Sequence, residues 1–206
     1  YFTEQFAAEG LLAIGTTNAT PRVSPPGGSV PVLGTNPIAV AVPDGAGGIA
    51  FQFDFSTSAV ALGRITMAAA AGEEIPFGWA VDADGHPTTD PQAALTGSLV
   101  SAGGYKGYGI GLLVEVLAGA LTGCRLSVDV PPLKSPEGEP HDLGQFYVVI
   151  DPDSYSGRTF HDRLAALAES ITVQEGARLP GAGRLPADPV DVEDSVWTLV
   201  TELAGD

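Results

Sequence analysis

The sequence predicts an α+β fold, in which a largely antiparallel sheet packs against helices. Two short apolar runs, residues 38–42 and 49–54, flank the turn-forming stretch 43–48 (PDGAGG), and strands joined this closely pair antiparallel. The helical segments that follow lack the strict strand–helix alternation of a parallel sheet. The sequence also lacks a Gly-x-Gly-x-x-Gly turn after a strand with an acidic residue at dinucleotide spacing, so a standard Rossmann domain is not indicated.

The N-terminal third of the chain predicts a helix end, a strand and a long irregular stretch. Residues 1–10 (YFTEQFAAEG) have the pattern of the last turns of a helix that ends at a C-cap glycine, so we expect a further segment upstream of Tyr1. Residues 11–16 (LLAIGT) are typical of a buried strand. Residues 18–36 are rich in proline and glycine and predict turns.

A helix and a long loop are expected after the hairpin. Ser56-Thr57-Ser58 offer N-cap hydroxyl groups for a helix over residues 59–71, and Gly72 supplies its C-cap. Residues 73–104 contain three prolines and an Asp-Gly pair, which predict a loop. Loops of this length inside a compact domain are usually functional, so we expect this one to contribute to a site or to wrap a surface.

The remaining elements follow from apolar periodicity. Residues 108–121 are apolar on nearly every face of a helix, which predicts a helix within the core. Residues 126–130 and 146–150 predict strands. Residues 158–173 predict an amphipathic helix, and residues 191–203 a closing helix with Asp191 as its N-cap.

Composition excludes several classes of function. The 206 residues carry 9 Lys and Arg against 25 Asp and Glu, and a net charge of −16 disfavours nucleic acid and anionic membranes as partners. Cys124 is the single cysteine, which excludes an intrachain disulfide and a multi-cysteine metal site and fits a cytoplasmic location. The longest apolar run, residues 108–121, is too short to span a bilayer and contains Glu115.

Two sites are candidates for binding an anion. Residues 54–58 (DFSTS) join a predicted strand to a predicted helix, where free amides and hydroxyl groups can hold a phosphate; the alternative is an ordinary N-cap. Lys106 follows Gly103-Gly104 at the start of the apolar helix, and its ammonium adds a positive charge. The alternative for Lys106 is a solvated side chain in a turn.

Glu115 and the three histidines can each be explained by a structural role as well as by a functional one. Glu115 lies in the apolar helix, and it is either paired with Arg64 or Arg125, exposed on a narrow polar strip, or a catalytic acid with a raised pKa. The three histidines are scattered along the chain, as solvated or structural histidines are.

Five motifs, in this order, resemble those of the type 2 malate/L-lactate dehydrogenase family, whose members include ureidoglycolate and sulfolactate dehydrogenases, diketogulonate reductase and cyclic-imine-2-carboxylate reductase. They are residues 34–39 (GTNPIA), 53–61 (FDFSTSAVA), 78–91 (GWAVDADGHPTTDP), 103–109 (GGYKGYG) and 179–181 (LPG). The resemblance covers essentially the whole chain. It implies hydride transfer between NAD or NADP and a small 2-oxo or 2-hydroxy acid or a cyclic imino acid, on a non-Rossmann, largely antiparallel fold that forms a homodimer.

The resemblance also assigns residues by motif matching. The implied cofactor contacts are Asp54, Phe55, Ser56, Lys106, Gly107, Gly181, Ala182 and Gly183. The positions implied to face the substrate are Ala19 and His141.

Three departures from the family pattern limit these assignments. Ala19 lacks the hydroxyl group that some relatives carry, and Ala182 replaces an acidic or amide residue. The family's Ser-His-Gly segment with its following arginine, and a second histidine, have no counterpart in residues 1–206. We therefore expect residues 1–206 to be the C-terminal, cofactor-binding portion of the oxidoreductase. The alternative is a non-catalytic module that keeps the fold.

Overall fold

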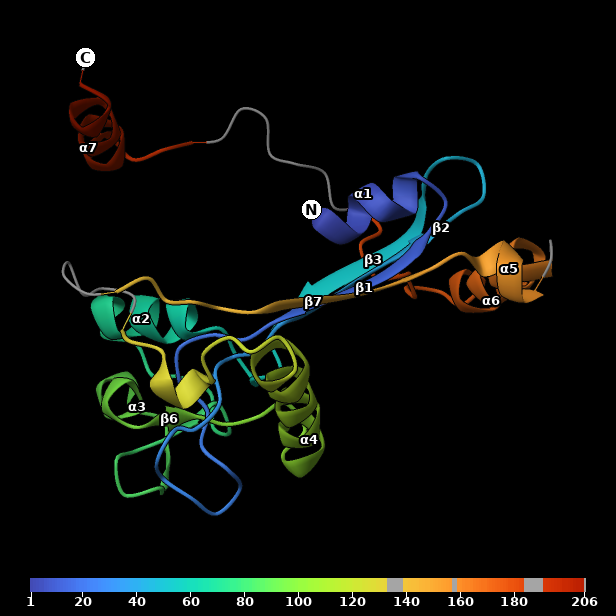
Figure 1. Cartoon of the computed structure of the whole chain (residues 1–206). Coiled ribbons are helices and arrows are strands. Elements are labelled where there is room, and N and C mark those ends of the chain that lie inside the picture. Colours follow the sequence, from blue (N-terminus) through green and yellow to red (C-terminus); the bar gives the residue numbers. More distant parts are fainter. Residues whose placement is uncertain (133–138, 157–158, 184–190, 206) are drawn as a thin grey trace.

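The computed structural model describes residues 1–132, 139–156, 159–183 and 191–205. Its larger sheet has four strands in the order β3-β2-β1-β7, and each neighbouring pair is antiparallel (Figure 1). The strands are β1 (Leu12–Thr17), β2 (Ile38–Pro43), β3 (Ile49–Phe55) and β7 (Gln145–Ile150). The predicted α+β class and the predicted β2–β3 hairpin are confirmed.

The β2–β3 hairpin is held by the side chain of Asp44. Its Oδ1 accepts hydrogen bonds from the backbone N–H of Ala46 (2.7 Å) and of Gly48 (2.8 Å). These two donors, Ala46 first, lower the pKa of the Asp44 carboxyl below its ordinary value. Gly45 and Gly47 have φ of +81° and +89°, which L side chains rarely adopt, so the glycines of the turn are required by its backbone.

Helix α1 (Phe2–Ala8) lies across one face of the larger sheet and contacts β1, β2 and β3 (Figure 1). The chain leaves the helix through Gly10, whose φ is +83°, so the helix end predicted at this glycine is confirmed. The ring centroids of Phe2 and Phe6 lie 6.3 and 6.2 Å from that of Tyr147 on β7. Aromatic contacts therefore tie α1 to the far edge of the sheet.

A second layer replaces the long loop expected over residues 73–104, and that expectation is wrong. It contains α3 (Pro91–Thr96) and a small sheet in the order β5-β4-β6, made of β4 (Ala80–Val81), β5 (Pro87–Thr88) and β6 (Ser98–Leu99). These elements pack with α2 (Leu62–Ala71) around a core that includes Ile65, Ile75 and Leu99. The strands have two residues each, too few to produce a visible alternation in the sequence.

Helix α2 begins later than predicted. Its N-cap is Ala61, which makes no side-chain capping bond, and Gly72 closes it with φ +69°. The prediction that Ser56-Thr57-Ser58 cap this helix is wrong, whereas the predicted C-cap is confirmed. The hydroxyl group of Ser58 instead donates to the carbonyl oxygen of Val60 (2.8 Å).

The expected core helix is helix α4 (Tyr105–Val114), which continues as the π-helix η1 (Glu115–Ala120). Glycines and small residues on one side are buried, but the opposite side is exposed, so the prediction of a helix buried all round is wrong. We call the exposed side the α4–η1 apolar face. It comprises Ile110, Leu112, Leu113, Val116 and Leu121.

The C-terminal third contains η2 (Ser127–Asp129), α5 (Pro152–Ser156), α6 (Thr159–Thr172) and α7 (Asp194–Ala204). The predicted amphipathic helix is confirmed as α6, whose apolar residues face β3 and residues 179–180 across an apolar hollow. The strand predicted at residues 126–130 is wrong, because η2 is a 3₁₀ turn.

Helix α7 has Glu193 rather than Asp191 as N-cap and has no buried residue. Within the described ranges, no helix is long and apolar enough to cross a membrane.

Candidate cofactor and substrate site

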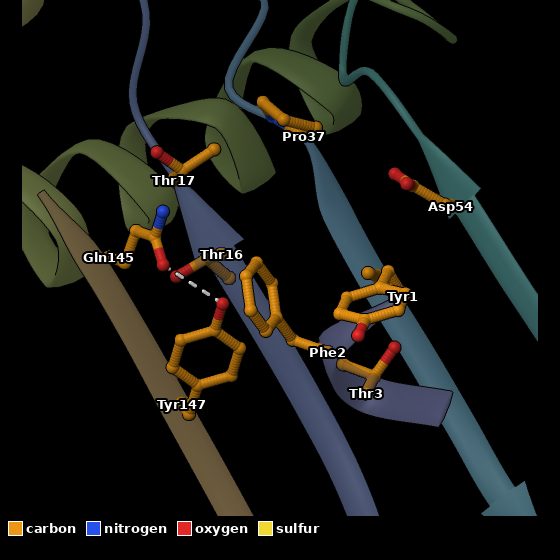
Figure 2. Close-up of a pocket in the computed structure, with 11 residues that line it drawn as sticks. Tyr1, Phe2, Thr3, Thr16, Thr17, Pro37, Asp54, Gln145 and Tyr147 are labelled. Atoms are coloured by element: carbon orange, nitrogen blue, oxygen red, sulfur yellow. Dashed lines mark hydrogen bonds between the residues drawn. The ribbon is translucent and has the colours of Figure 1, made fainter. Parts of the chain in front are cut away.

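A cavity of about 220 Å³ opens on the sheet face that α1 covers (Figure 2). Hydroxyl groups and aromatic rings dominate its wall, which is formed by Tyr1, Phe2, Thr3, Gly15, Thr16, Thr17, Pro37, Ala39, Asp54, Gln145 and Tyr147. Asp54 contributes a carboxylate from β3, at the opposite edge of the sheet from Tyr147 on β7 (Figure 2). Of the predicted site residues, Asp54 is the one that lines this cavity.

Gly15 shapes the floor of this cavity. A Cβ at Gly15 would lie 2.8 Å from the ring of Tyr147, so the absence of a side chain lets the ring lie against β1. The Tyr147 hydroxyl donates to Oε1 of Gln145 (3.0 Å), which fixes the orientation of both side chains. Sequence analysis missed these residues, although a glycine inside a predicted strand is a known signal of close approach.

The first predicted cofactor segment lies where β3 ends. Phe55 is half-exposed, and its ring stacks on that of Phe53 at 5.0 Å. Ser56 follows, and then the N–H and Oγ1 of Thr57 donate to the carbonyl oxygen of Thr35 at 2.8 and 3.0 Å. Because α2 begins at Leu62, this segment is not a helix N-terminus, and the amide argument made for it from the sequence is wrong.

The second predicted cofactor segment lies directly beside the first. The Ala102 N–H donates to the carbonyl oxygen of Thr57 (2.9 Å), and Ser58 and Ser101 form an antiparallel bridge. Gly107 is buried in the first turn of α4, where a Cβ would lie 2.0 Å from the carbonyl oxygen of Ala102, so glycine is required for this close approach. Lys106, the preceding residue, is exposed.

The third predicted cofactor segment lies along the outer edge of β3. The Gln52 N–H donates to the carbonyl oxygen of Pro180 (3.2 Å). Gly181 has φ +80°, and a Cβ there would lie 2.8 Å from the Gln52 side chain and carbonyl oxygen. Residues 178–183, which include Ala182 and Gly183, line a hollow of about 430 Å³. The three segments therefore follow one another along β3 and its continuation.

The two predicted substrate positions are linked through hydrogen bonds of their neighbours in the chain. Asn18, which precedes Ala19, donates from Nδ2 to the carbonyl oxygen of Arg125 (2.7 Å) and accepts at Oδ1 from the Gly144 N–H (3.0 Å). The Arg125 N–H donates to the carbonyl oxygen of Asp142 (3.1 Å), which follows His141. Among the described residues, the buried Nε2 of His141 has no hydrogen-bond partner.

Glu115 is neither exposed nor paired with an arginine, so two of the environments that the sequence allowed are wrong. It is 6% exposed, and its carboxylate accepts hydrogen bonds from Asn36 Nδ2 (2.8 Å), the Ser127 N–H (2.5 Å) and Ser127 Oγ (2.5 Å). Arg125 pairs with Glu139 instead, at 2.5 Å. Sequence analysis missed this buried network, because its members are far apart along the chain.

Comparison with known families decides what these segments belong to. The sequence model described as malate/L-lactate dehydrogenase matches residues 1–191. The chain belongs to the malate/L-lactate dehydrogenase family. The predicted resemblance is therefore confirmed.

Curated relatives of this family include two bacterial enzymes. A (2R)-3-sulfolactate dehydrogenase (NADP⁺) of Chromohalobacter salexigens is 42% identical over 181 residues, which are 88% of this chain and 54% of the relative. A Δ¹-pyrroline-2-carboxylate/Δ¹-piperideine-2-carboxylate reductase of Pseudomonas putida is 40% identical over 203 residues, 98% of this chain and 59% of the relative. The chain thus spans somewhat more than half the length of these relatives.

Solved structures of the malate/L-lactate dehydrogenase family share the fold. The Δ¹-piperideine-2-carboxylate reductase of Pseudomonas syringae superposes with a TM-score of 0.86 at 36% identity, over 98% of this chain and 62% of that structure. The sulfolactate dehydrogenase of Methanocaldococcus jannaschii gives 0.84 at 30% identity, over 100% and 62%. These neighbours confirm the predicted non-Rossmann α+β fold.

Proposed function

We propose that residues 1–206 are the C-terminal, cofactor-binding portion of an oxidoreductase that transfers hydride between NAD or NADP and a small 2-oxo or 2-hydroxy acid or a cyclic imino acid. One observation carries the proposal: the three segments matched to the family's cofactor contacts lie side by side along β3 and its continuation. The names of the relatives support it, since one is NADP⁺-dependent and acts on sulfolactate and others reduce cyclic imino acids.

The residues present fit a dinucleotide. The first turn of α4, which begins at Tyr105, and the exposed ammonium of Lys106 provide the helix N-terminal amides and the positive charge that favour a pyrophosphate. The Asp54 carboxylate, facing the 220 Å³ cavity, is an acceptor for ribose or amide donors. When bound, the nicotinamide ring supplies or accepts the hydride.

The substrate would lie near Ala19 and His141. Among the described residues, Nε2 of His141 has no hydrogen-bond partner, and if substrate binding exposes this buried atom it can donate to a substrate oxygen or hold a proton for it. Reduction of a carbonyl also requires a positioned acid and a cation for the substrate carboxylate. We assign these two roles to the histidine and arginine segments that other family members carry outside the matched part.

Binding and turnover test this proposal separately. Titration of the chain with NADPH and with NADH, followed by nicotinamide fluorescence, should show saturable binding of one or both. Protein expressed from the complete reading frame should consume NADPH or NADH with one member of a panel of 2-oxo and cyclic imino acids. Binding without turnover would favour the alternative, a non-catalytic cofactor-binding module, which Ala182 and the lack of a matching acid/base histidine in residues 1–206 support. Binding of neither nucleotide would refute the cofactor site.

We also propose that the protein is a homodimer, as the family resemblance implies, and that it works in the cytoplasm, as its single cysteine favours. The α4–η1 apolar face supports self-association, because its exposed side chains are aliphatic and uncharged. Each copy has a net charge of −16, so contacts between charged surfaces of two copies would be repulsive and an uncharged face is favoured. Sedimentation velocity should show a dimer for the wild type and a monomer for Leu113→Asp. A monomeric wild type would contradict this assignment.

A further inference from the structure

We propose that Glu115 is a positioning residue of the cofactor and substrate site. Its buried carboxylate accepts a hydrogen bond that stabilises the turn at residues 34–36. The backbone of this turn contacts Ala19 and the first cofactor segment, which is hydrogen-bonded to the second. The identity of the ligand rests on the proposed function, whereas the path of contacts from Glu115 to the site is a property of the fold.

Glu115 acts on the turn through Asn36. The Asn36 side chain donates from Nδ2 to Glu115 Oε2 (2.8 Å) and to the carbonyl oxygen of Gly111 (3.0 Å). Asn36 is fully buried and has φ +38°, a backbone conformation that residues other than glycine rarely adopt. Such a conformation persists only where surrounding contacts enforce it, and these two hydrogen bonds supply that constraint.

The same turn contacts each part of the proposed site. A Cβ at Gly34 would lie 2.4 Å from the carbonyl oxygen of Ala19, so the two backbones are in close contact. The carbonyl oxygen of Thr35 accepts both hydrogen bonds of Thr57, next to Ser56. Thr57 then accepts from Ala102, which leads into the loop before Lys106. A shift of the 34–36 turn is therefore transmitted to both cofactor segments and to Ala19.

A carboxylate is required at this position because all of its partners donate. Asn36 Nδ2, the Ser127 N–H and Ser127 Oγ all donate to Glu115, and together they compensate its burial without a cation. The isosteric Glu115→Gln change would direct an N–H₂ group at one of these donors. The residue also begins the π-helical stretch η1, a feature often found at functional sites.

The test compares Glu115→Gln with a destabilised control variant, each measured at the same distance below its own melting midpoint. Ile75→Ala lowers stability by opening a cavity in the α2–α3 core, where Ile75 is 2% exposed. This core also contains Leu33, which precedes the 34–36 turn, but the substitution removes none of the hydrogen bonds of Glu115 and Asn36. Temperature is set so that both variants are equally distant from their melting midpoints. We expect Glu115→Gln to raise the Kd for NADPH about tenfold (about 1.4 kcal/mol) and to accelerate hydrogen exchange at the Thr57 and Ala102 amides. The control should change neither.

Each other outcome has a defined meaning. Wild-type affinity and exchange in Glu115→Gln would overturn the proposal, as would an equal loss of affinity and protection in the control. If the wild type does not bind NADPH, the proposed function fails, and exchange at the two amides alone decides the positioning role. If Glu115→Gln does not fold, Asn36→Gly replaces it, since glycine tolerates φ +38° but removes both side-chain hydrogen bonds. The same increase in Kd and exchange is then expected.

Discussion

Replacing Lys106 by alanine should weaken cofactor binding without lowering protein stability. Lys106 is the second residue of α4 and is exposed, and within the described part of the chain no carboxylate oxygen lies within 4.0 Å of its ammonium. A cation near a helix N-terminus opposes the helix dipole. Lys106→Ala should therefore leave the free energy of unfolding unchanged or raise it by up to about 1 kcal/mol.

The effect on binding follows from the proposed phosphate contact. A hydrogen bond between a charged donor and a phosphate contributes about 1.5–3 kcal/mol, and exposure of Lys106 to solvent reduces this to about 1–2 kcal/mol. The Kd for NADPH should thus rise about 5–30-fold. The difference between wild type and variant should shrink as salt is added, because the contact is screened.

The assay pairs an NADPH fluorescence titration with a thermal melt on the same samples at two salt concentrations. Arg163→Ala serves as a control, since Arg163 is an exposed cation on α6 that belongs to none of the three cofactor segments and lines neither the 220 Å³ cavity nor the 430 Å³ hollow. The control should leave the Kd unchanged. An unaltered Kd in Lys106→Ala, or a loss of affinity accompanied by an equal loss of stability, would refute the assignment of Lys106 to a phosphate.

Three further substitutions test the fold around the site. Gly181→Ala must hold φ +80° against Gln52, so it should lower the free energy of unfolding by about 1–2 kcal/mol in a urea titration and weaken NADPH binding. The pKa of Asp44 is lowered from 3.8, so the ionised carboxylate stabilises the folded protein above pH 3.8, and this stabilisation is lost as the pH falls through the folded pKa. Asp44→Asn should remove this acid dependence from thermal melts. Ile65→Ala in the core should cost about 2–5 kcal/mol of stability, measured by urea unfolding.

Local signals in the sequence predicted the hairpin, the strands of the larger sheet and the C-caps. Turn-forming residues between two short apolar runs, and glycines with positive φ after helices, act over a few residues and are visible in the sequence. The helix start at Ser56–Ser58 was predicted wrongly because Thr57 has its partner at Thr35, about twenty residues away. The strand at residues 126–130 was wrong for a related reason: Glu115 takes the hydrogen bonds of Ser127.

The site was predicted as separate motifs and not as an arrangement. The family resemblance named the three cofactor segments, but their alignment along β3 depends on long-range contacts such as that between Gln52 and Pro180. Polar residues such as Asn36 and Ser127 carry no local sign of burial, because their partners come from other elements. Apolar residues likewise do not reveal which of them stay exposed, and α4 shows the consequence.

The absence of buried residues on α7 gives the protein a built-in optical probe. The chain has two tryptophans: Trp79 packs against the α2–α3 core, and Trp197 on α7 is 60% exposed. Their emission should separate into a shorter-wavelength component shielded from iodide and a longer-wavelength component that iodide quenches. Because acidic residues surround α7, a neutral quencher such as acrylamide should reveal Trp197 more fully than iodide does. Any surface that comes to cover α7 would then be read directly as loss of quenching at Trp197, while Trp79 reports whether the core remains intact.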